Sequence, residues 1–150
     1  MLCDCNKRKV YAMSLQEKEK PTEKPDPALV SEINQRLKDG MLPCAVAHDI
    51  ARDLQIAPLK VGQAADALEI SLSKCQLGLF GYKPDKKIVK AETNPPADVL
   101  AAIQTALQDG KIACSEVWEI ADRMNVPRSK ASNVCEGQRI KVKPCQLGAF

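Results

Sequence analysis

Four cysteines stand in two matching pairs, and their thiols are the side chains of this sequence best suited to chemistry. Cys44 and Cys75 recur as Cys114 and Cys145 at a constant offset of 70 residues. Three interpretations stay open. The cysteines fill the core as small apolar groups, or each pair forms a reversible disulfide, with Cys44 and Cys114 activated at helix N-termini. In the third, both pairs hold one zinc ion or iron–sulfur centre.

A second group of side chains suits the binding of a polyanion. Basic and polar residues gather near the C-terminal end: Arg128, Ser129, Lys130, Ser132, Asn133, Arg139, Lys141 and Lys143. Arg and Lys can neutralise phosphates or donate to guanine, and Asn can pair with adenine through two hydrogen bonds. The equivalent part of the first half offers only Lys60 and Gln63 among such candidates. We therefore expect the second half to make most contacts with double-stranded DNA.

Other chemistries find little support. His48 is the single histidine, and the sequence has no Ser/His/Asp set, no Gly-rich phosphate loop and no HExxH motif. We therefore expect a protein that is not an enzyme. No cofactor is expected either, apart from the zinc or iron–sulfur alternative that the cysteines leave open.

The matching cysteines belong to an internal repeat. Residues 30–80 align without a gap to residues 100–150, and 14 of the 51 aligned positions are identical. Each copy ends in nearly the same six residues, Cys-Gln-Leu-Gly-Leu-Phe and Cys-Gln-Leu-Gly-Ala-Phe. Such a repeat indicates one small folding unit present twice. Units of this size are marginal alone, so packing against each other, or in a homodimer, would stabilise both.

The net charge, the apolar runs and the cysteine content indicate in which compartment the protein is expected. The net charge is only +3, and no apolar run is long enough to cross a bilayer, so no membrane partner is expected. The N-terminal residues lack the apolar stretch of a secretory signal. Seven cysteines without an export signal favour free thiols, metal ligands or redox switches in the cytoplasm.

Four segments follow from composition and the repeat. Residues 1–27 are charged and Pro-rich and should form a disordered tail. Residues 28–82 form the first repeat, and residues 97–150 form the second. Between them, residues 83–96 are rich in Lys and Pro and should form a linker.

The periodicity within each repeat predicts three helices followed by a β-hairpin. Apolar spacing predicts helices over about 30–37, 44–54 and 58–68, and over their equivalents in the second repeat. Gly40 and Gly110 are interpreted as the stops of the first helices. Alternation at 70–73 and 140–143 predicts a strand, with Cys-Gln-Leu-Gly as the second strand of the hairpin. The predicted fold class is mainly α with small β wings.

This order resembles that of winged helix-turn-helix regulators of bacteria. The resemblance rests on a small residue in the second helix and apolar residues after the turn and in the third helix: Ala51, Ile56 and Val61, and Ala121, Val126 and Ala131. It implies that the third helix enters the major groove of DNA while the wing contacts the backbone. It also implies that the short strand before Cys44 pairs antiparallel with the strand beginning at Cys75, which would bring the two thiols together.

The expected function is therefore a DNA-binding transcriptional regulator with two tandem winged helix-turn-helix units, to which a redox or metal response of the cysteines could be added. The alternative is a non-enzymatic adaptor that uses the same folds to bind a protein partner, because winged helices also serve that purpose.

Overall fold

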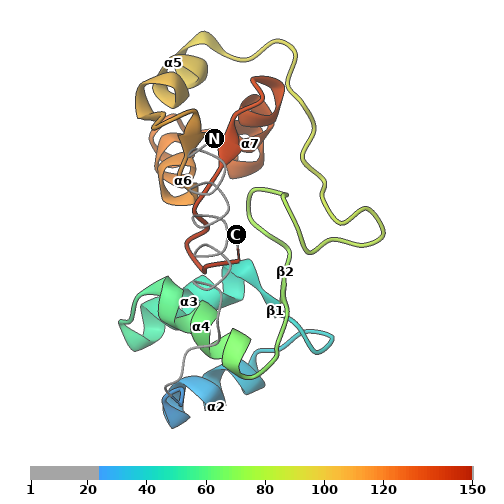
Figure 1. Ribbon diagram of the computed structural model, residues 1–150, viewed down its shortest axis with the longest axis vertical. Coiled ribbons are helices and arrows are strands. Elements are labelled where there is room, and N and C mark those ends of the chain that lie inside the picture. Colours follow the sequence, from blue (N-terminus) through green and yellow to red (C-terminus); the bar gives the residue numbers. More distant parts are fainter. Residues whose placement is uncertain (1–23, 150) are drawn as a thin grey trace, which may run out of the picture.

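The computed structural model describes residues 24–149 and is mainly helical (Figure 1). Phe150 and residues 1–23, which hold most of the predicted tail, lie outside the described residues. The six helices among the described residues are α2 (Pro27–Gln35), α3 (Cys44–Leu54) and α4 (Pro58–Ala67) in the first repeat, and α5 (Ala97–Ala106), α6 (Cys114–Arg123) and α7 (Arg128–Gly137) in the second. Within residues 24–149, no helix is long and apolar enough to span a membrane.

A short turn joins the second and third helices of each repeat. It contains a residue with positive φ, Gln55 in the first repeat and Asn125 in the second. Pro58 then begins α4, and Pro127 directly precedes α7, because proline is well placed where a helix starts. These helices were predicted within a residue or two of their observed ends.

The first helix of each repeat ends earlier than predicted. Helix α2 stops at Gln35, and Gly40 lies in a tight hairpin instead of capping the helix. Lys38 and Met41 exchange backbone hydrogen bonds of 2.8 and 3.0 Å around Asp39 and Gly40, which both have positive φ. An Asp-Gly pair favours this type of two-residue turn. Asp109 and Gly110 form the same turn in the second repeat.

The short strands pair in parallel, so the predicted antiparallel pairing and the winged hairpin are wrong. Strand β1 (Leu42–Pro43) pairs with β2 (Leu72–Ser73), and β3 (Lys111–Ile112) pairs with β4 (Lys141–Val142). Two helices lie between the strands of each pair, and a crossover of this kind brings the second strand back in parallel.

The Cys-Gln-Leu-Gly segments form turns instead of the predicted second strand. The amide of Gly78 donates to the carbonyl of Cys75 at 2.9 Å, and Gly148 donates to Cys145 at 3.1 Å. Both glycines have a φ near +75°, which a residue with a side chain rarely adopts.

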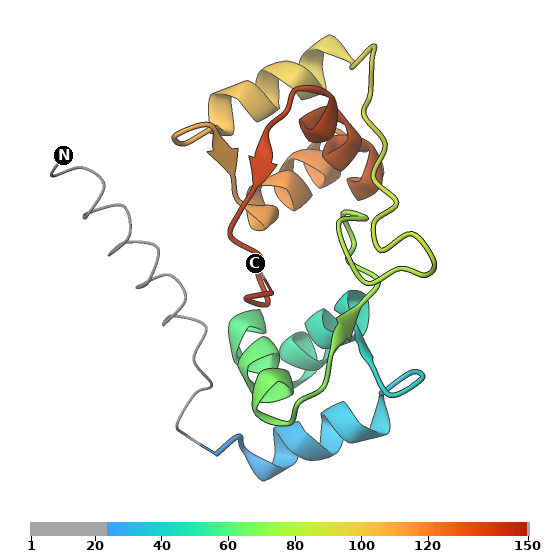
Figure 2. The same cartoon turned by 45° about the vertical axis from the view of Figure 1, so that its right-hand side comes forward.

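These two turns are exchanged between the repeats. Leu77 belongs to the apolar core built by α5, α6 and α7, whereas Leu147 belongs to the core built by α2, α3 and α4. Figure 2 shows the C-terminal segment reaching the first repeat, while the chain after β2 rises toward the second. Both leucines are buried almost completely. Each repeat thus completes its core with a side chain of the other.

The linker runs along the outer face of α7. The carbonyl and the side-chain Oδ1 of Asn133 accept hydrogen bonds from the amides of Glu92 (3.0 Å) and Lys90 (2.9 Å). The chain passes so close to Gly137 that a Cβ there would lie 2.2 Å from the Glu92 carbonyl oxygen. The first repeat has Ala67 at this position. The linker is therefore part of the folded second repeat.

Candidate functional site

Four buried cysteines surround the junction between the repeats, and we call them the quartet: Cys44, Cys75, Cys114 and Cys145. Cys44 and Cys114 are the first residues of α3 and α6, and Cys75 and Cys145 open the two exchanged turns. The exchange places Cys75 in the same core as Cys114, and Cys145 in the same core as Cys44. The quartet therefore draws thiols of both repeats to one place.

Local contacts bring the thiols of the quartet near one another. The amide of Cys114 donates to the Pro144 carbonyl at 3.1 Å, and Gln146 Nε2 lies 3.5 Å from Cys114 Sγ. The equivalent Gln76 hydrogen-bonds through its backbone to the Cys44 thiol. A negative charge on any of the other three cysteines would also raise the pKa of Cys44. The predicted proximity of Cys44 and Cys75 thus has a different origin from a winged hairpin.

Burial sets the protonation of three cysteines of the quartet, Cys44, Cys75 and Cys114. It raises the pKa of Cys44 to about 12 and that of Cys114 to about 11, and it also raises the pKa of Cys75. Desolvation of the thiolate thus outweighs the expected activation at the helix N-termini. The five cysteines of residues 24–149 are free thiols, and in this range no three Cys, His, Asp or Glu side chains stand close enough around one point to hold a single metal ion.

Two aromatic rings at equivalent repeat positions, those of His48 and Trp118, lie in tilted contact. The ring centroids of His48 and Trp118 are 4.3 Å apart, and the Arg128 guanidinium lies 3.7 Å from the Trp118 ring centroid. Trp118 packs against both apolar cores. This contact was not predicted from the sequence, although His48 and Trp118 stand at equivalent positions of the two repeats. Arg128 is thereby engaged in the junction, where it also pairs with Asp122 at 3.2 Å.

The pKa of His48 should be far below that of an ordinary histidine. Its burial, followed by the charge of Arg128, lowers the pKa from 6.5 to about 4. The unfolded chain binds this proton at higher pH than the folded chain does, so the stability contributed by neutral His48 is complete above pH 6.5 and is lost as pH falls toward 4. Because His48 is the single histidine, one NMR titration of its ring measures the midpoint. A folded-state midpoint near 6.5, equal to that in denaturant, would contradict the partial burial of the His48 ring against Trp118.

The outer face of α7 differs from the predicted one at two positions. Ser132 was expected to face outward, but it is buried, and its hydroxyl has no hydrogen-bond partner among the described residues. Asn133 was expected to read adenine, but its side-chain oxygen accepts the Lys90 amide. The reason in both cases is tertiary, since the linker and the exchanged turn cover this face. Ser129 and Lys130 remain exposed at the helix start, as do Lys60 and Gln63 on α4.

Three exposed lysines line the β3–β4 pair, and we call them the basic ladder: Lys111, Lys141 and Lys143. Lys111 stands directly opposite Lys141 in the strand register. Within residues 24–149, neither these lysines nor the exposed Arg139 forms an ion pair. Like charges facing each other across strands repel. The first repeat carries uncharged Met41, Ser71 and Ser73 at the equivalent positions. Lys111 was not among the binding residues predicted from the sequence.

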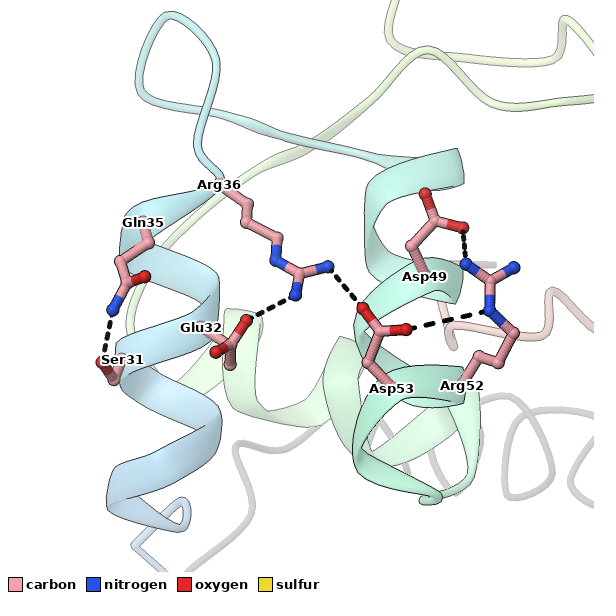
Figure 3. A network of polar contacts seen from close by, with 7 residues as sticks. All are labelled: Ser31, Glu32, Gln35, Arg36, Asp49, Arg52 and Asp53. Atoms are coloured by element: carbon pink, nitrogen blue, oxygen red, sulfur yellow. Dashed lines mark hydrogen bonds and ion pairs between the residues drawn. The ribbon is translucent and has the colours of Figure 1, made fainter.

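The first repeat instead pairs its charges internally (Figure 3). Arg36 bridges Glu32 at 2.7 Å on its own helix and Asp53 at 2.9 Å on α3, and Arg52 pairs with Asp49 at 2.9 Å. These groups are partly exposed, so each pair adds little stability. Their carboxylates also leave the outer side of α3 unsuited to phosphates, in contrast to the basic ladder.

No family model, curated protein or solved structure matches this chain. The candidate functions therefore rest on the residues and the geometry described above.

Proposed function

We propose that this chain is a DNA-binding transcriptional regulator built from two tandem helix-turn-helix units without wings. The basic ladder is the observation that carries this proposal. Three lysines on one short strand pair repel one another, and a row of phosphates would relieve that repulsion. Lys130 and Arg139, also exposed in the second repeat, would extend the contact beyond the ladder.

The described geometry favours contacts with the DNA backbone over the reading of bases. Asn133 holds the linker and Ser132 is buried, which leaves only the start of α7 for a groove. Arg128 stacks on Trp118, so its loss would disturb the junction as well as any DNA contact. The test of the proposal should therefore rest on the ladder.

Replacing Lys111, Lys141 and Lys143 by alanine should weaken binding to duplex DNA by about tenfold or more at moderate salt. Each lysine that leaves a phosphate removes about one unit from the slope of log affinity against log salt, so the slope should fall by about three. Fluorescence anisotropy with a labelled random duplex, repeated at several salt concentrations, measures both quantities.

The matched control removes the same charge outside the second repeat, by alanine at the exposed Lys24, Lys38 and Lys74. Equal losses in both triple variants would show attraction to net charge alone. If the parent chain binds no duplex even at low ionic strength, the adaptor function replaces this proposal. The covering of α7 by the linker is the observation that favours such an adaptor.

A further inference from the structure

We propose that the second repeat binds a small organic acid with an apolar body, of the class of medium-chain carboxylates, in a cavity beside strand β4. The cavity has a volume of about 370 Å³. It is lined by residues of α7 and β4 and by Leu79, which follows the exchanged turn of the first repeat. Ligand sites typically have volumes of about 300–1,000 Å³ and combine apolar walls with a few polar groups. This cavity has both features.

The wall of this cavity is apolar in one part and basic in another. Leu79, Ile140 and Val142 supply aliphatic side chains that are half-buried or buried. Lys141 and Lys143, two lysines of the basic ladder, also line the cavity. An apolar chain would cover the aliphatic side chains from water, and the ammonium groups would compensate the charge of a carboxylate. A neutral apolar molecule would leave the basic part of the wall without a partner.

Ser132 adds a hydrogen-bond donor to the wall. The residue is 1% exposed and lines the cavity, and its hydroxyl has no hydrogen-bond partner among the described residues. A buried hydroxyl without a partner is destabilising. An oxygen of a carboxylate in the cavity would accept a hydrogen bond from it. The flexible stems of the two lysines allow their ammonium groups to approach the same carboxylate.

The acidic residue in the described lining is already paired with a lysine. Glu136 Oε1 lies 3.2 Å from Nζ of Lys87, so the charge of this carboxylate is compensated. Neither Lys141 nor Lys143 forms an ion pair with a described residue. The uncompensated charge of the lining is therefore positive, which favours an anion.

The first repeat has a cavity at the equivalent place, but the charged residues of its lining have the opposite sign. Residues 70–72 line it, and they align with residues 140–142 of the second repeat. Asp66 and Glu69 also line it, and no lysine does so among the described residues. Gly62, the counterpart of Ser132, is not part of its lining. An organic acid should therefore choose the cavity of the second repeat.

This proposal stands on the cavity and does not depend on DNA binding. Its test contains no DNA, so its failure is distinguishable from a failure of the proposed DNA binding. Where both proposals hold, the acid and the DNA backbone compete for Lys141 and Lys143, and each weakens the binding of the other by the same factor.

The test titrates the full chain with octanoate and measures the heat by isothermal titration calorimetry. We expect saturable binding at a single site. 1-Octanol, which has the same chain without the charge, should bind at least about fivefold more weakly, because it leaves the ammonium groups without a partner. When the same titration is followed by NMR, the backbone amide signals of Leu79 and residues 140–143 should shift, and those of residues 70–72 should not.

Replacing Lys141 and Lys143 by serine should lower the affinity for octanoate about fivefold or more, because two charged partners of the carboxylate are lost. Serine fits this strand, since the first repeat carries it at both equivalent positions. The matched control replaces Lys38 and Lys74, two exposed lysines outside the second repeat and outside the cavity, by serine. Its affinity should stay within about twofold of the parent, because salt screens charges outside the cavity.

Ser132→Ala should lower the affinity for octanoate about threefold or more, because one hydrogen bond to the carboxylate is lost. Circular dichroism identifies a variant that fails to fold, and the titrations of the parent chain decide in that case. The proposal is overturned if the parent binds no octanoate at millimolar concentration, or if 1-octanol binds as tightly. It is equally overturned if the shifts fall on residues 70–72, if both lysine variants lose the same affinity, or if folded Ser132→Ala binds as the parent does.

Discussion

Truncating Leu147 to alanine should destabilise the first repeat, although Leu147 belongs by sequence to the second. Its side chain is 1% exposed and packs in the core of α2, α3 and α4. Removing a leucine side chain from such a core costs about 2–5 kcal/mol, because apolar contacts are lost and a cavity remains. Hydrogen exchange followed by mass spectrometry should show faster exchange in α2, α3 and α4, and chemical denaturation should give the loss of free energy of unfolding.

Leu77→Ala is the reciprocal experiment, and the accelerated exchange should then fall in α5, α6 and α7. Ile88→Ala controls for a loss of apolar surface in general, because Ile88 is 49% exposed and should change stability little. If Leu147→Ala loosened only the helices of its own repeat, the exchange of turns would be wrong.

Replacing Gly62 by alanine should also destabilise the chain, against the usual preference of helices for alanine. A Cβ at this position in α4 would lie 1.8 Å from the carbonyl oxygen of Leu147. Alanine favours a helix over glycine by about 1 kcal/mol, but forcing an atom into a packed contact costs about 1–3 kcal/mol or more. The clash is with backbone, which cannot swing away, so we expect the clash to win. Thermal unfolding measures the net change.

Ser132→Ala is the matched control, because Ser132 is the equivalent residue of the second repeat. It removes one buried, unpartnered oxygen and adds no atom, so the stability should stay the same or rise. An increase in stability for Gly62→Ala would mean that the exchanged turn does not press on α4.

The helical framework could be predicted from sequence because its signals are local. The spacing of Ala47, Ile50 and Ala51 marks a buried helical face, and all three are buried in α3. Prolines 58 and 127 marked the starts of the third helices, as observed. The end of α2 was misplaced because an Asp-Gly pair fits a tight hairpin as well as a helix stop.

The strand pairing and the exchange could not be predicted, because alternation shows that a strand exists but not which strand it pairs with. Leu72 alternates with its neighbours as a strand does, yet its partner Leu42 lies across two helices and runs in parallel. The sequence predicts that the apolar side chains of Leu77 and Leu147 are buried in a core. The residues around them do not indicate which of the two cores each side chain enters. The analogy to winged regulators supplied an antiparallel hairpin that the structure does not have.

The candidate site was predicted in composition but not in arrangement. Repeat alignment identified the four cysteines of the quartet, and the structure buries all four. The outer face of α7 was inferred from helical spacing alone, and spacing cannot register a linker that folds back over Asn133. Lys111 went unnoticed because its partner Lys141 is adjacent only through the parallel register.

The exchange of Leu77 and Leu147 between the two cores also affects the order in which the repeats can fold. During synthesis the first repeat is complete long before Leu147 is added. The core of α2, α3 and α4 therefore lacks the Leu147 side chain until the second repeat has been made. Contacts within a helix form fast, whereas Leu147 and the α2–α4 core residues that it packs against are separated by more than half of the chain, which slows their contact. Two copies of a single repeat, each lending its turn to the other, would satisfy the same geometry. The duplicated chain carries out within one molecule what such a dimer would need two molecules to do.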